Sequence, residues 1–159
     1  SMRDGFRQIF HYNTEGKLIK KLTDNKWMIN EIIGMDQSKT KLIFSGTGEN
    51  ATENHIYHVD LKSAKTTKIT NEKGTHHARL SAGGNYLIDT YSSLEVPNKI
   101  SIISTDGKEK KQLFLADNPL KEHGIGNTEI FDIQAEDGTT LYCRTIKPFD
   151  FDPNKKYPS

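Results

Sequence analysis

The fold class is decided by residues 55–70, which read HIYHV, DLKSA and KTTKIT in succession. The two outer segments have the composition of short strands, and a polar turn separates them. This stretch therefore predicts a β-hairpin. The same pattern occurs at residues 8–23 and 100–114, and the corresponding anchors Leu22, Ile69 and Leu113 are 47 and 44 residues apart.

A second kind of hairpin lies between these copies. Residues 28–34 and 41–45 flank a polar turn at 36–40, and residues 77–81 and 86–91 flank Ala82-Gly83-Gly84-Asn85. Four short strands every ~40–50 residues are typical of a β-propeller blade, which must stack against neighbours to bury both faces. The chain holds two such periods and a leading hairpin, whereas a closed ring needs ~4–8 blades.

Composition limits the classes of partner. The 159 residues carry a net charge of only +1, which argues against nucleic acid or an anionic membrane as a partner. The hydrophobic set makes up 33%, and mean hydropathy is −0.71, so the core is thin for this length. No apolar run approaches the ~18 residues that a membrane-spanning helix needs.

The pattern changes after Phe114. Residues 116–124 predict a short helix, with Asn118 as its cap, Pro119 in its first turn and Gly124 at its exit. Residues 129–135 and 140–146 predict another hairpin, and a proline-punctuated loop follows at 148–158. Ser1-Met2 resembles a cloning remnant and no natural stop follows Pro158, so we expect both ends to continue in a longer protein.

Short motifs in a fixed order resemble the dipeptidyl peptidase IV branch of the prolyl oligopeptidase serine peptidases. They are Arg3-Asp4-Gly5-Phe6-Arg7, Leu22-Thr23 with Trp27, Gly74-Thr75-His76, Ser81-Ala82-Gly83-Gly84-Asn85-Tyr86, Asp89-Thr90-Tyr91-Ser92-Ser93, Phe131, Asp137-Gly138, Leu141, Pro148, Phe151-Asp152-Pro153 and Lys155-Lys156-Tyr157-Pro158. Each motif is weak alone, but their order and spacing extend over nearly the whole chain.

The resemblance implies an all-β fold made of a partial β-propeller, a short linking helix and a C-terminal β-hairpin. Residues 1–114 would be the last propeller blades, about two four-stranded antiparallel blades plus a leading hairpin. Residues 115–127 would be the helix and linker, and residues 128–159 the truncated start of an α/β-hydrolase domain. It also implies a periplasmic or otherwise exported protein.

The implied function is that of a non-catalytic part of a serine exopeptidase that removes N-terminal Xaa-Pro or Xaa-Ala dipeptides, with the propeller gating access and shaping the substrate site. No Gly-x-Ser-x-Gly nucleophile elbow and no Glu-Glu pair occurs in the chain, and Tyr157 precedes the family's oxyanion tyrosine segment. We therefore expect no catalytic residue, cofactor site or metal site here. The alternative is a stand-alone propeller-like binding module without peptidase activity.

Several polar groups invite a functional interpretation that we weigh against a structural one. Adjacent His76 and His77 point to opposite faces of a strand, as do His55 and His58, which argues against shared metal binding. Ser92 or Ser93 with His76 and Asp89 has the composition of a triad, yet these serines lie in a predicted loop with no elbow. Hydroxyls that cap a loop are the simpler account.

The remaining candidates favour structural roles. Asp132, Glu136 and Asp137 surround a predicted hairpin turn, and Lys108–Lys111 predict a solvated strand edge. Trp27 is expected to fill the core between blades with Ile32, Ile43 and Tyr57, although a ligand platform is the alternative. The lone Cys143 excludes an internal disulfide and is expected to be a small buried residue, and we give no weight to the Asn50-Ala51-Thr52 sequon.

The expected partners are the rest of a longer chain and, for the whole protein, a peptide substrate. Blades without neighbours expose apolar faces and open strand edges, which favour strand addition or domain swapping. We therefore expect this chain to self-associate.

Overall fold

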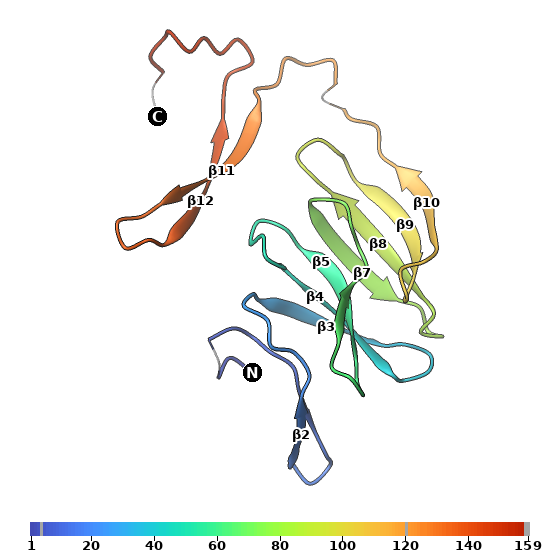
Figure 1. Cartoon of the computed structure of the whole chain (residues 1–159). Helices are drawn as coiled ribbons and strands as arrows, with labels where there is room; N and C mark the ends of the chain where they lie inside the picture. Colours follow the sequence, from blue (N-terminus) through green and yellow to red (C-terminus); the bar gives the residue numbers. More distant parts are fainter. Residues whose placement is uncertain (4, 120, 158–159) are drawn as a thin grey trace. The chain divides into compact units, whose positions relative to one another are not determined.

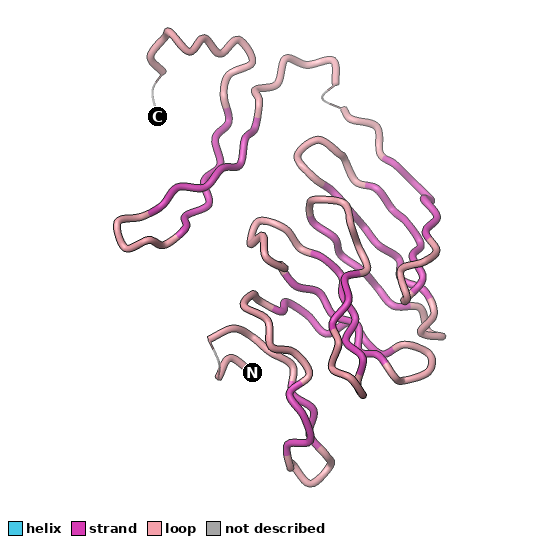
Figure 2. Tube along the Cα trace, viewed as in Figure 1, coloured by secondary structure: helices cyan, strands magenta, loops and turns pink. Residues whose placement is uncertain are grey.

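The computed structural model describes residues 1–3, 5–119 and 121–157, and within them it contains twelve β-strands and no helix (Figure 2). The strands are β1 (Phe10–Tyr12), β2 (Leu18–Lys21), β3 (Ile29–Met35), β4 (Lys41–Gly46), β5 (His55–Asp60), β6 (Thr66–Lys68), β7 (Thr75–Leu80), β8 (Tyr86–Ser92), β9 (Lys99–Ser104), β10 (Lys110–Leu115), β11 (Thr128–Gln134) and β12 (Thr140–Ile146). The all-β prediction is confirmed.

The strands form antiparallel sheets of consecutive neighbours. β1 pairs with β2, β3 to β6 form one four-stranded sheet, β7 to β10 form a second, and β11 pairs with β12 (Figure 1). Each four-stranded sheet is a meander in sequence order, as the two predicted periods require. An isolated bridge between Asn54 and Thr75 links the two large sheets at one end.

Two apolar clusters cover the two faces of the β3–β6 sheet. On one face, Phe44 and Tyr57 pack with Ile9 and Leu22 from the first hairpin. On the other face, Ile43, Ile56 and Ile69 pack with Leu87 and Ile103 from the β7–β10 sheet. Alternation along the strands produces this division, because Ile43 and Phe44 are adjacent in β4 and both are fully buried.

The chain divides into two compact units, Ser1–Ala116 and Asp117–Ser159. The first unit contains both four-stranded sheets and the leading hairpin. The second contains the β11–β12 hairpin, whose register runs without a bulge from Thr128 opposite Ile146 to Gln134 opposite Thr140. Apolar side chains on both strands of this hairpin are exposed, among them Ile130, Phe131 and Leu141.

The helix predicted at residues 116–124 is wrong. The described residues of this stretch form an irregular segment with a turn, in which the Lys121 amide donates to the Asn118 carbonyl. Leu120 lies outside the described residues, as do Asp4, Pro158 and Ser159, which the sequence motifs also include. A segment this short and polar, which packs no apolar face, gains too little to offset helix nucleation.

Leu22 and Ile69 are buried and each joins an apolar cluster, whereas Leu113 on the outer strand β10 is 53% exposed. Two packing predictions need correction. Cys143 is half-buried rather than buried. Trp27 contacts Tyr57 as expected, but Ile32 is exposed and Ile43 belongs to the opposite face, so neither packs with Trp27.

Candidate functional site

The polar and aromatic groups of interest gather at one end of the two four-stranded sheets. The register places Thr75 opposite Ser92, Tyr91 opposite Lys99, and Lys99 opposite Leu115, so these residues share that end. The bridge from Asn54 to Thr75 brings the β4–β5 loop, residues 47–54, to the same end. This end therefore holds loops from both sheets.

A continuous row of rings crosses from one sheet to the other at this end. In order, its members are Trp27, Tyr57, His55, His76 and Tyr91. The centroid of the Trp27 ring lies 4.8 Å from that of Tyr57, and the His55 and His76 centroids are 5.4 Å apart across the two sheets. His76 stacks on Tyr91 at 4.6 Å. These ring contacts join the two sheets at this end, in addition to the aliphatic cluster that packs between them.

The predicted combination of His76, Asp89 and a serine is only partly assembled. His76 Nδ1 lies 2.9 Å from the Asp89 Oδ2 atom, and both side chains are almost completely buried. The other ring nitrogen, Nε2, lies 2.9 Å from the Glu72 carbonyl oxygen, to which it donates. Both nitrogens are thus occupied, and His76 does not act as a base toward a serine in this arrangement.

One of the two serines fills the simpler role. Ser93 Oγ accepts hydrogen bonds from the amides of Glu95 and Val96, at 3.3 and 3.1 Å, and so caps its loop as expected. Ser92 is the last residue of β8 rather than a loop residue.

His55 is held by a second acidic contact. Its Nε2 lies 2.6 Å from Glu53 Oε2, and its Nδ1 lies 3.2 Å from the Thr70 hydroxyl. Burial lowers the pKa of His55 more than the Glu53 hydrogen bond raises it. Burial raises the pKa of Glu53, but hydrogen bonds from His55 and Asn50 outweigh burial and lower it.

The other histidines occupy separate surroundings. His76 is buried whereas its neighbour His77 is exposed, as strand alternation predicts. His58 is buried elsewhere, with Nδ1 3.3 Å from the Thr105 carbonyl oxygen. Within the described residues, no group of three or more His, Cys, Asp or Glu side chains is arranged to hold a metal ion.

The predicted acidic candidates of the second unit lie in and beside a hairpin turn. Asp137 Oδ1 accepts a hydrogen bond from the Thr139 amide, and hydrogen bonds from Thr139 lower the pKa of Asp137. Asp132 is an exposed residue of β11, and Glu136 is an exposed residue of the turn. Tyr157 stacks on Phe151, and its hydroxyl accepts a hydrogen bond from the Asp152 amide.

The lysine run at the start of β10 is only partly a solvated edge. Lys108 pairs with Asp106 at the surface, 3.4 Å apart. Lys110 instead pairs with Glu72, which also accepts from Lys99 at 2.8 Å. Glu72 thereby connects the loop before β7 to β9 and β10 of the same sheet.

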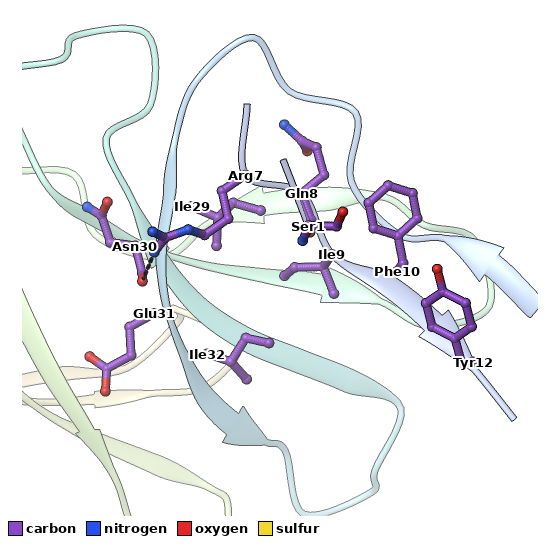
Figure 3. A pocket seen from close by; sticks show the side chains of 10 residues that line it. All are labelled: Ser1, Arg7, Gln8, Ile9, Phe10, Tyr12, Ile29, Asn30, Glu31 and Ile32. Atoms are coloured by element: carbon purple, nitrogen blue, oxygen red, sulfur yellow. Dashed lines mark hydrogen bonds between the residues drawn. The ribbon is translucent and has the colours of Figure 1, made fainter. Parts of the chain in front are cut away.

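Two hollows border β3. A pocket of about 240 Å³ separates the first hairpin from β3, where the Arg7 guanidinium donates to the Asn30 carbonyl (Figure 3). Its lining includes Ser1 but no histidine or lysine that could activate a hydroxyl. A larger groove of about 670 Å³ lies between β3 and β7, with Glu31, His77 and Arg79 among its polar groups.

Comparison with known proteins decides the family. Residues 1–98 match the family model described as the dipeptidyl peptidase IV (DPP IV) N-terminal region. The chain belongs to the dipeptidyl peptidase IV N-terminal region family. It therefore comes from the propeller region of that family, as the sequence motifs predicted.

Relatives of the DPP IV family cover nearly the whole chain. Dipeptidyl peptidase 4 of Trichophyton rubrum is 28% identical over 97% of this chain, and the same holds for that of Trichophyton equinum. The crystal structure of Porphyromonas gingivalis dipeptidyl peptidase 4 superposes with a TM-score of 0.87, at 28% identity over 99% of this chain. The chain spans 21% of the two Trichophyton proteins and 23% of the Porphyromonas chain.

The row of rings was not predicted from the sequence. His55 and His76 belong to different sheets, and no spacing in the sequence predicts that their rings meet. The only available signal is that each begins or nearly begins a strand, which places both at the same end of neighbouring sheets.

Proposed function

We propose that this chain is the non-catalytic part of a DPP IV-like serine exopeptidase that removes N-terminal Xaa-Pro and Xaa-Ala dipeptides. The observation that carries the proposal is the match of both four-stranded sheets and the β11–β12 hairpin to Porphyromonas gingivalis dipeptidyl peptidase 4, over 99% of this chain. The chemistry would be acyl transfer by Ser, His and Asp groups with an oxyanion hole, supplied outside this chain.

In this proposal the two four-stranded sheets are consecutive propeller blades, within residues 1–114. The repeated meander and the apolar cluster that joins one sheet to the next support this assignment. Residues 115–127 are the linker, and residues 128–159 begin the α/β-hydrolase domain. The exposed apolar side chains of β11 and β12 support this assignment, because such a hairpin needs a larger sheet to cover it.

The proposed role of the blades is to restrict access to the peptidase site and to shape the end of the substrate that carries the free amine. The groove between β3 and β7 supports this role, since the first strand of each sheet borders it and charged side chains line it. The partners are the rest of the longer chain and a peptide substrate, with no nucleic acid. Export to the periplasm is part of the same proposal.

Expression of the whole reading frame tests the proposal. We expect the frame to continue past Lys156-Tyr157-Pro158 into Tyr-x-Gly-Pro and later Gly-x-Ser-x-Gly, and the product to hydrolyse Gly-Pro p-nitroanilide. Fractionation of the source cells should place it outside the cytoplasm. A frame that ends without these motifs would instead favour a stand-alone binding module.

A further inference from the structure

A cleft of about 370 Å³ opens beside the β4–β5 loop, wholly within the first unit. Trp27 and Tyr57 supply aromatic surface, Glu49 and Glu53 supply carboxylates, and Lys68 is the remaining charged residue of the lining. We call this hollow the acidic aromatic cleft. It is separate from the groove between β3 and β7 described above.

The Tyr57 hydroxyl is a hydrogen-bond acceptor that is open to the cleft. Tyr57 is only 6% exposed, yet its hydroxyl makes no hydrogen bond within the described part of the chain. A Cβ on Gly48 would lie 2.5 Å from that oxygen, so the hydroxyl reaches the bare backbone of a residue that also lines the cleft. The hydroxyl oxygen remains accessible to solvent, so a ligand in the cleft can donate to it without displacing a protein partner.

The electrostatics of the cleft favour a cation. Burial raises the pKa of Tyr57 to about 12, and the negative charges of Glu53 and Glu49 add to that effect. Glu53 is already bound by His55 and Asn50, whereas Glu49 makes no ion pair or hydrogen bond within the described residues. One carboxylate and one hydroxyl oxygen are thus open to a donor.

A planar cation satisfies all of these groups at once. A guanidinium stacks on an indole face through cation–π attraction, and its forked N–H groups match a carboxylate. We propose that the acidic aromatic cleft binds a guanidinium group, stacked on Trp27 and bonded to Glu49 and the Tyr57 hydroxyl. Lys68 opposes this binding by charge and weakens it.

Fluorescence of Trp27 provides the test, because Trp27 is the single tryptophan of the chain. The chain is titrated with N-acetylarginine amide and, at equal ionic strength, with the neutral isostere N-acetylcitrulline amide. We expect a saturable change with the arginine compound and at least tenfold weaker binding of the citrulline compound. No saturable change, or equal binding of both compounds, would overturn the proposal.

Charge variants distinguish the cleft from other surfaces. Glu49→Gln should weaken binding of the arginine compound at least fivefold, whereas Lys68→Gln should strengthen it at least twofold. Glu15→Gln, in the exposed turn of the first hairpin, is the matched control and should leave the affinity unchanged. Unchanged affinity in Glu49→Gln, with wild-type circular dichroism, would contradict the proposal.

The source of the guanidinium is distinguished by a parallel titration with ethylguanidinium and with an acetyl-Gly-Arg-Gly amide peptide. Tighter binding of the peptide indicates recognition of an arginine within a polypeptide, and equal binding indicates a small cation. Binding of neither would overturn the proposal.

Discussion

Trp27 stands over the backbone of Gly46, where an added Cβ would lie 2.5 Å from the indole, and its other contacts are Tyr57 and Phe44. The ring therefore closes the cluster shared by the first hairpin and the β3–β6 sheet. The same side chain also borders the acidic aromatic cleft. Trp27 thus both packs against the core and lines the cleft, so the two interpretations of this residue are compatible.

Replacement of Trp27 by alanine should lower the free energy of unfolding by about 3 kcal/mol, since it removes a large aromatic ring and leaves a cavity against Tyr57. Urea unfolding followed by circular dichroism measures the change. Leu94→Ala, at an exposed position, is the control and should change stability by less than about 0.5 kcal/mol. A loss below about 1 kcal/mol for Trp27→Ala would mean that the ring contributes little to the core.

Glu72 is expected to make stability depend on acid pH. Burial raises its pKa, but hydrogen bonds from Lys110 and Lys99 outweigh burial and lower the pKa from 4.5 to about 2. A carboxyl with a lower pKa in the folded state stabilises the fold above its unfolded pKa and loses that effect as pH falls. The contribution of Glu72 should therefore disappear between about pH 4.5 and pH 2.

Urea unfolding at pH 6 and pH 3 checks this expectation. Wild type should lose more stability over this range than Glu72→Gln, by about 1 kcal/mol or less because Glu72 is about one third exposed. Glu15→Gln serves as the control and should follow wild type. Equal losses in wild type and Glu72→Gln would show that the Lys99 and Lys110 contacts do not stabilise the fold.

The two four-stranded sheets also contact one another through their turns. The Gln37 amide donates to the Gly84 carbonyl, which joins the β3–β4 turn to the β7–β8 turn. Gly84 has φ +72, and a Cβ there would lie 2.6 Å from the Gln37 nitrogen. A glycine is needed at this position both for its backbone conformation and for the close approach.

Gly84→Ala should therefore destabilise the chain by about 2–3 kcal/mol, through left-handed strain and the clash with Gln37. Gly16→Ala is a matched control, because Gly16 has φ +80 but nothing within 4 Å of its added Cβ. It should cost only about 1 kcal/mol of strain. Thermal or urea unfolding measures the loss of stability in each variant. Equal losses in the two variants would mean that the close approach of the two turns does not affect stability.

Most elements could be predicted because each hairpin carries its own local signal. The predicted strand at residues 140–146 coincides with β12, and the strand predicted at 86–91 ends one residue before β8 does. The predicted helix failed because Pro119 and Gly124 serve a turn as well as they serve helix ends. The contact of His55 with His76 depends on packing between sheets, which local patterns do not encode.

At the scale of the whole molecule, large apolar side chains remain uncovered. Leu113, Phe114 and Leu115 on the outer strand β10 are exposed, as are Ile133 and Tyr142 on the second unit's hairpin. An edge strand and a hairpin with such side chains favour pairing with another chain. Within the described residues, no helix is long and apolar enough to cross a bilayer.

We expect the purified chain to self-associate as its concentration rises. Sedimentation velocity over a concentration series measures this directly. Leu113→Lys on the exposed face of β10 should weaken association, whereas Leu94→Lys, in a loop, should not. A single 18.0 kDa species at the highest soluble concentration would show that the exposed faces do not associate.

We propose that this chain contributes binding surface and access control but no peptidase chemistry. Hydrolysis of Gly-Pro p-nitroanilide by the purified 159-residue chain, at high protein concentration, tests it most directly. We predict no turnover above buffer, because both nitrogens of His76 are occupied and the chain has no nucleophile elbow. Turnover that survives repurification and is abolished by His76→Gln would contradict the account.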